Sequence, residues 1–79
     1  MKIIVSRGSL IAKDLEGPEE VVGKKIFFTG ELFNEGFMLT KYSASCEDGQ
    51  KISKESVDKM IPQLVEATKQ QKQIELMVW

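Results

Sequence analysis

A predicted β-hairpin between residues 24 and 46 constrains the fold more than any other stretch. Two runs of strand-forming residues, Lys24–Phe33 and Phe37–Cys46, flank the short segment Asn34-Glu35-Gly36. A three-residue loop that ends in glycine is typical of a type I turn followed by a left-handed residue, because glycine has no Cβ to clash. The loop places Phe33 opposite Phe37 and so predicts the register of the hairpin.

This register sorts the side chains of the hairpin onto two faces of very different composition. The face predicted to point into the core carries Ile26, Phe28, Leu32, Met38, Tyr42, Ala44 and Cys46. The face predicted to point outward carries Phe27, Thr29, Glu31, Phe33, Phe37, Leu39, Lys41 and Ser43. The outward face mixes charges with aromatic rings, which is typical of the centres of protein interfaces.

The segment before the hairpin allows two interpretations. Lys2–Ser6 has β-branched residues on both faces, which predicts a strand at the centre of a sheet. After it, Ser9 can cap a short helix that runs to Leu15 and stops before Gly17 and Pro18. Alternatively, a turn at Arg7-Gly8 leads into a returning strand over Leu10–Lys13. The start and stop signals favour the helix.

The segment after the hairpin predicts one long amphipathic helix and a last strand. Ser53 is a suitable N-cap, and the helix is expected from Lys54 to about Gln71. Pro62, on its polar side, should kink or split it. Alternating apolar residues over Gln73–Trp79 predict a half-buried strand. The apolar stripe of the helix consists of Val57, Met60, Ile61, Leu64 and Val65, at helical spacing.

These elements predict a single compact α+β domain over residues 1–79. The expected architecture is a small antiparallel sheet of about four strands with one main amphipathic helix on one face. If the segment from Ser9 to Leu15 is a helix, the element order is β-α-β-β-α-β, which is that of a ferredoxin-like fold with the first and third strands central.

Composition limits the chemistry. The chain has no histidine, which excludes histidine-based acid–base relays and histidine-bound metals. The single Cys46 is followed by Glu47 and Asp48, which disfavour a reactive thiolate. We therefore expect no enzyme activity, no cofactor and no metal site. With 11 basic and 12 acidic residues, no cysteine pair and no long apolar run, the expected location is cytoplasmic, without membrane association.

One segment resembles a nucleic-acid-binding family. Glu35-Gly36-Phe37-Met38-Leu39-Thr40-Lys41-Tyr42 is similar to the RNP1 strand of RNA-recognition motifs at Gly36, Phe37 and Tyr42. The resemblance implies that Phe37 and Leu39 stand at the outward positions that stack on bases. It departs from the family at Glu35, where a basic residue is usual. The balanced charge also disfavours phosphate binding.

The function expected by exclusion is protein binding through an exposed aromatic sheet face. A small protein–protein interaction module of this kind fits a regulator or inhibitor of a larger protein, including the type carried by phages and mobile elements. Single-stranded nucleic-acid binding on the same face and a structural homodimer subunit are the alternatives. The candidate partner-binding residues are Phe27, Glu31, Phe33, Phe37, Leu39, Lys41 and Trp79.

Overall fold

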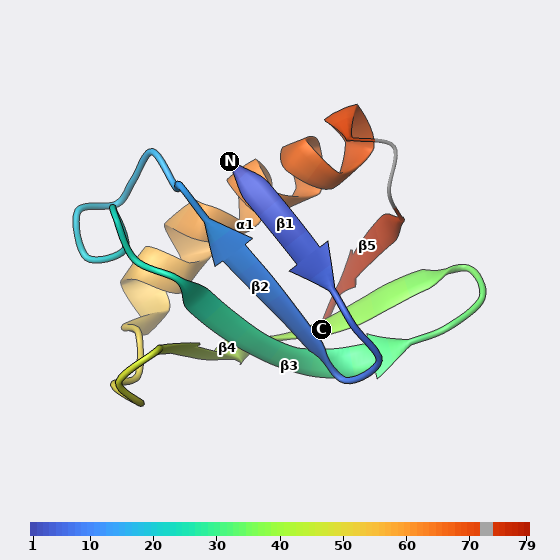
Figure 1. The fold of residues 1–79 in the computed structure, drawn as a ribbon, viewed down its shortest axis with the longest axis horizontal. Helices are drawn as coiled ribbons and strands as arrows, with labels where there is room; N and C mark the ends of the chain where they lie inside the picture. Colours follow the sequence, from blue (N-terminus) through green and yellow to red (C-terminus); the bar gives the residue numbers. More distant parts are fainter. Residues whose placement is uncertain (72–73) are drawn as a thin grey trace.

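A computed structural model describes residues 1–71 and 74–79 and confirms the α+β class. The described residues form one helix and five strands (Figure 1). In chain order the elements are β1 (Lys2–Val5), β2 (Ser9–Lys13), β3 (Ile26–Leu32), β4 (Gly36–Cys46), α1 (Lys54–Gln70) and β5 (Glu75–Val78). The strand predicted from Gln73 begins two residues later, and Gln73 itself lies outside the described residues.

The sheet follows the order β1-β2-β3-β4-β5, which differs from the ferredoxin-like order. β1 to β4 pair antiparallel with their sequence neighbours, and β5 joins β4 in parallel after the crossover through α1. β1 therefore lies at the edge of the sheet, so its predicted central position was wrong. The strand count is five rather than about four, because the segment predicted as a short helix is β2.

β2 is a strand because it can form a ladder on both sides. Its Leu10 pairs with Val5 of β1 and with Phe28 of β3. Its side chains alternate between the core and the opposite face, as a strand between two neighbours requires. Ser9, the predicted helix cap, instead closes the β1–β2 turn, where its carbonyl accepts a hydrogen bond from the Ser6 amide at 2.9 Å. Tertiary pairing thus outweighs the local helix signals.

α1 agrees closely with its prediction. The Ser53 hydroxyl accepts a hydrogen bond from the Ser56 amide at 3.3 Å and caps the helix. The predicted stripe faces the core, with Val57, Met60 and Leu64 fully buried. Pro62 lies on the exposed side and does not split the helix, which continues to Gln70.

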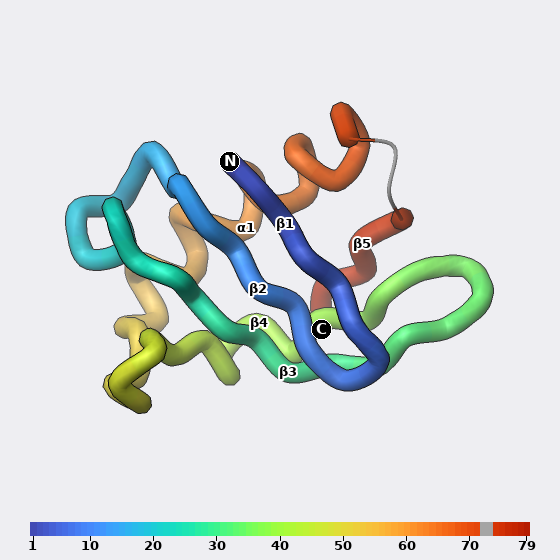
Figure 2. The backbone as a smooth tube through the Cα atoms, viewed as in Figure 1, coloured from blue at the N-terminus to red at the C-terminus, as the bar shows by residue number. Residues whose placement is uncertain are grey.

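The sheet curls around one face of α1. The helix contacts β1, which is the first strand in the sheet order, and β4 and β5, which are the last two. A flat sheet could not bring both of its edges to one helix, so the strands must wrap, as the ribbon in Figure 1 shows. The tip of the β3–β4 hairpin projects beyond this wrapped body (Figure 2).

The hairpin register is shifted by one residue from the predicted one. Phe37 pairs with Leu32 rather than with Phe33, so the connection runs over residues 33–36. Gly36 does not take the left-handed conformation expected of it. A Cβ at this position would collide with the Glu75 carbonyl, so Gly36 allows the close approach of β5 to β4. The requirement for glycine comes from tertiary packing, and the turn prediction was wrong.

An irregularity in β4 divides the hairpin into a tip and a base. Thr29 pairs with Thr40 and Phe27 pairs with Ser45, so two steps along β3 correspond to five along β4. The Ser43 hydroxyl accepts a hydrogen bond from the Thr29 amide at 2.8 Å and donates one to the Thr40 carbonyl at 2.6 Å. This hydroxyl therefore satisfies backbone groups where the ladder is interrupted.

The irregularity changes which β4 residues point into the core. In the tip, Phe37 and Leu39 are buried, whereas in the base Ala44 and Cys46 are buried. We call the side of the sheet that carries these residues the inner face and the opposite side the outer face. The sheet residues buried on the inner face are Ile3, Leu10, Ala12, Ile26, Phe28, Phe37, Leu39, Ala44 and Cys46.

Candidate protein-binding surface

The predicted aromatic face is not formed as expected, because two of its members lie in the core. Phe37 and Leu39 are each 0% exposed. The one-residue shift turns them toward α1, and Met38, predicted to be in the core, turns outward in their place. The exposure predicted for Phe37 and Leu39 was therefore wrong, and so were the base-stacking positions implied by the resemblance to RNA-recognition motifs.

Three other predicted residues meet at one hollow on the outer face. Glu31, Phe33 and Trp79 line a depression of about 430 Å³ at the hairpin tip. Phe33 is 45% exposed and Trp79 is 77% exposed, so both rings are open to solvent. The complete lining, which we call the tip hollow, consists of Thr29, Gly30, Glu31, Phe33, Met38, Thr40 and Trp79.

β5 brings Trp79 to the hollow. The parallel register places Met77 beside Met38 and Val78 beside Leu39. The Trp79 amide then donates a hydrogen bond to the Leu39 carbonyl at 2.8 Å, which fixes the backbone of Trp79 against β4. Because side chains alternate along a strand, Trp79 shares the outer face with Met77. The indole therefore extends over the sheet from a backbone that is held in place.

A second apolar row crosses the base of the outer face. Ile4 pairs with Ile11, and Ile11 pairs with Phe27, so the side chains form a continuous row across three strands. Ile11 and Phe27 are half-buried and Ile4 is exposed. Phe27 was predicted to face outward and does so. It does not line the tip hollow.

Glu31 and Lys41 do not form the polar pair expected within the patch. The Lys41 ammonium lies over the Tyr42 ring, 4.8 Å from its centroid. Tyr42, predicted in the core, is exposed, and its hydroxyl donates a hydrogen bond to the Asp58 carboxylate of α1 at 2.8 Å. Lys41 therefore belongs to a cluster beside α1. Within the described residues, Glu31 has no ion pair.

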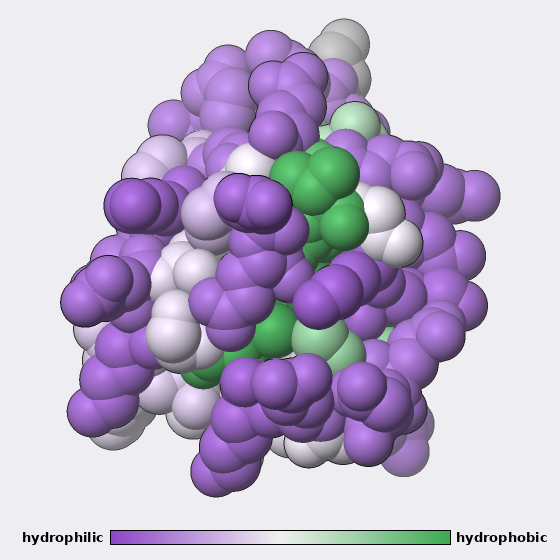
Figure 3. Space-filling view, turned by 90° about the vertical axis from the view of Figure 1, so that its left-hand side faces the viewer, coloured by the Kyte–Doolittle hydropathy of each residue, from purple (hydrophilic) through white to green (hydrophobic). Residues whose placement is uncertain are grey.

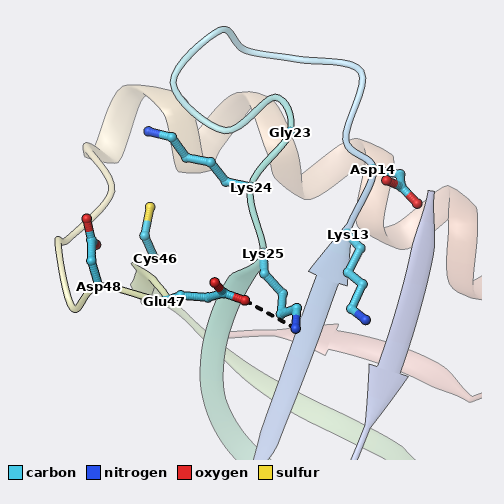
Figure 4. A pocket seen from close by; sticks show the side chains of 8 residues that line it. All are labelled: Lys13, Asp14, Gly23, Lys24, Lys25, Cys46, Glu47 and Asp48. Atoms are coloured by element: carbon cyan, nitrogen blue, oxygen red, sulfur yellow. Dashed lines mark ion pairs between the residues drawn. The ribbon is translucent and has the colours of Figure 1, made fainter.

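A separate hollow of about 380 Å³ lies at the base of the hairpin, where β3 begins and β4 ends. Figure 4 shows its lining side chains. Its walls carry both signs of charge, and Lys25 pairs with Glu47 at 3.1 Å. Cys46 also contributes to the lining but is buried. Figure 3 shows that the surface at this end is mostly hydrophilic. The lining residues are Lys13, Asp14, Gly23, Lys24, Lys25, Cys46, Glu47 and Asp48.

Glu20 fastens the loop between β2 and β3 to the start of α1. Its carboxylate accepts hydrogen bonds from the Ser56 hydroxyl at 2.6 Å, from the Ser53 amide at 3.0 Å and from the Ser53 hydroxyl at 2.8 Å. These bonds, with that from Ser56 as the strongest influence, lower the pKa of Glu20 below its ordinary value of 4.5. The arrangement completes a helix cap and is structural.

The remaining chemistry of the described residues is limited. No three carboxylate or thiol side chains among residues 1–71 and 74–79 gather closely enough to hold a metal ion. In the same ranges, no helix combines the length and apolar character needed to cross a membrane. The tip hollow is thus the place where exposed aromatic rings, a thioether and an unneutralised carboxylate come together.

Sequence reasoning missed Met38 and Met77 as outer-face residues. Met38 was assigned to the core by the predicted register, and Met77 depends on which strand β5 joins. The pairing of β5 with β4 leaves only an indirect signal in the sequence, namely a glycine at position 36 that the turn does not require. No family model, curated protein or solved structure matches this chain.

Proposed function

We propose that this chain is a small protein-binding module whose docking site is the tip hollow. The observation that supports the proposal is the placement of Trp79 and Phe33, two exposed rings, around one depression on a face that α1 leaves open. Exposed tryptophan is costly to hydrate and is enriched among the residues that dominate binding energies. A partner that covers these rings would gain most of its affinity there.

The proposed mode of action is occlusion or recruitment of a larger protein. The hairpin tip projects beyond the wrapped body and can enter a groove on a partner. A regulator or inhibitor needs only such a contact, with no chemistry of its own. The backbone of Trp79 is fixed by hydrogen bonding to β4, which reduces the entropy lost on binding.

Site-specific photo-crosslinking in cells would test this proposal. A photoreactive phenylalanine analogue at position 33 should give a discrete protein adduct. The same analogue at Lys59, which is exposed on α1, should not give that adduct. Light scattering of the purified protein would show whether the captured partner is a second copy of the chain.

The partner identified in this way should then be purified and its affinity measured. Trp79→Ala should weaken the complex at least tenfold, as expected for the removal of a central anchor. Lys59→Ala should leave the affinity unchanged. An adduct of equal yield at both positions, or a complex insensitive to Trp79→Ala, would contradict the proposal.

A further inference from the structure

We infer that the tip hollow receives a positively charged side chain, lysine or arginine, of the protein partner. This inference rests on the proposed function, because it names the chemistry of the group that docks at the same site. Phe33 and Trp79 contribute two aromatic rings to the lining, and Met38 contributes a polarisable thioether. Such walls attract a cation that has lost part of its water.

The charge of the hollow points in the same direction. Glu31 is the one ionisable side chain among its lining residues, so an arriving cation would meet a carboxylate. Lys41, the basic residue next to Thr40 of the lining, lies over the Tyr42 ring rather than beside Glu31. A carboxylate beside two aromatic rings complements a cation and repels an anion.

A side chain of a protein fits this site better than a free cation does. The hollow opens onto a sheet face where Met38 lies beside Met77, which gives a peptide apolar surface to cover on either side of its charge. At an exposed site, contact between a cation and a ring changes a binding constant by only about two- to fivefold. Binding by the cation alone would therefore be weak, and flanking contacts must supply the rest.

The indole of the chain's single tryptophan provides a direct readout. The Trp79 indole N–H resonance can be followed while N-acetyl-arginine methylamide is added at constant ionic strength. The neutral analogue N-acetyl-norleucine methylamide has a similar alkyl stem without charge. We expect saturable binding of the arginine probe, about fivefold tighter than that of the norleucine probe.

Variants assign the preference to the hollow. Glu31→Gln should reduce the arginine preference to about twofold, and Phe33→Leu should weaken arginine binding without a matching loss for norleucine. Phe27→Leu, on the separate apolar row, should change neither. Equal binding of the two probes by the wild type, or an arginine preference that Glu31→Gln leaves undiminished, would overturn the inference.

The outcomes separate this inference from the proposed function. If Trp79→Ala weakens binding of the crosslinked partner but the two probes bind equally well, only the cation inference fails. Tetramethylammonium chloride serves as the free-cation probe. If it binds more tightly than the arginine probe and no protein adduct forms at position 33, the hollow is a small-cation site, and both proposals fail.

Discussion

The two faces of the sheet carry similar residues but have different surroundings. The inner face holds Phe28, Phe37 and Leu39 beneath α1, where they are fully buried. The outer face holds Phe27, Met38 and Trp79, which no helix or strand of the described residues covers and which range from half-buried to exposed. Apolar composition therefore does not distinguish the core from the candidate binding surface. The register of the hairpin and the position of the helix make the distinction.

The largest expected effect comes from removing an inner-face ring. Phe37→Ala should reduce the free energy of unfolding by about 3–5 kcal/mol, because it leaves a cavity in a closely packed core. Phe33→Ala, on the outer face across the loop, should reduce the free energy of unfolding by less than about 1 kcal/mol. Urea unfolding followed by circular dichroism would measure both.

Phe37→Leu offers a milder version if the alanine variant does not fold. Its cost should still exceed that of Phe33→Ala. Similar unfolding midpoints for the variants at positions 33 and 37 would contradict the difference in burial between the inner and outer faces.

The second effect tests the close approach within the hairpin tip. A Cβ at Gly30 would meet the Met38 carbonyl oxygen and the Phe37 ring. Gly30→Ala should therefore destabilise the protein by about 2–3 kcal/mol in urea unfolding. Gly8→Ala is the matched control, since nothing lies within 4 Å of a Cβ there. A cost at Gly30 no greater than that at Gly8 would argue against the observed register.

The third effect depends on pH and concerns the cap of α1, which covers the inner face. Because folding lowers the pKa of Glu20, its contribution to stability is complete above the ordinary value of 4.5 and is lost as the pH falls through the folded-state pKa. Glu20→Gln should lower the urea midpoint at pH 7. The difference from the wild type should shrink as the pH falls below 4.5 and through the lowered pKa of Glu20.

Glu19→Gln is the control for Glu20→Gln. The Glu19 carboxylate is adjacent in the sequence, but the hydrogen bonds from Ser53 and Ser56 go to Glu20. That variant should follow the wild type across the pH range. A difference between Glu20→Gln and the wild type that stays constant from neutral to acidic pH would show that the ionised form of Glu20 is not the stabilising species.

A smaller effect is expected at the β4 irregularity, where Tyr42 reaches α1. Tyr42→Phe removes the hydrogen bond to Asp58 but keeps the ring under Lys41. Because the pair is exposed, the cost should be about 0.5–1 kcal/mol. A double-mutant cycle with Asp58→Ala would isolate the interaction, and additive effects of the two substitutions would mean that the bond contributes nothing.

The smallest effect on stability is expected at Trp79. The hydrogen bond from Trp79 to the Leu39 carbonyl is donated by the backbone amide, so a substitution of the side chain keeps it. The indole is mostly exposed to solvent. Trp79→Ala should therefore change the free energy of unfolding by less than about 0.5 kcal/mol. Combined with a large loss of partner affinity, this result would assign the outer face to binding. A strongly destabilised variant would instead make the indole part of the fold.

The sequence predicts those parts of the fold whose signals are local. The capping residue Ser53 and the apolar stripe identify α1 almost to the residue. The hairpin was also found, but its register was wrong, because the glycine at position 36 is needed by β5 rather than by the turn. β2 was also misassigned because of tertiary contacts. Its pairing with β1 and β3 outweighs the local signals for a helix cap at Ser9.

The candidate site was predicted only in part. Glu31 and Phe33 were named from the outward face of the predicted hairpin and Trp79 as a separate candidate, and all three line one hollow. Their meeting depends on the pairing of β5 with β4, which no short-range pattern specifies. Phe37 and Leu39 were placed outward because a shift of one residue exchanges the faces of a strand. Faces were thus harder to predict than elements.

The irregularity in β4 allows the tip and the base of the hairpin to change independently. Its extra residues absorb the mismatch between the two pairing registers, and the Ser43 hydroxyl holds the gap together. Loss of a single residue between Thr40 and Ser45 would exchange the two faces of β4 in the tip. The Met38 side chain would then point toward α1 and the Phe37 ring toward solvent. Insertions and deletions here would therefore change the composition of the outer face abruptly, whereas substitutions in the loop at residues 33–35 would change it gradually.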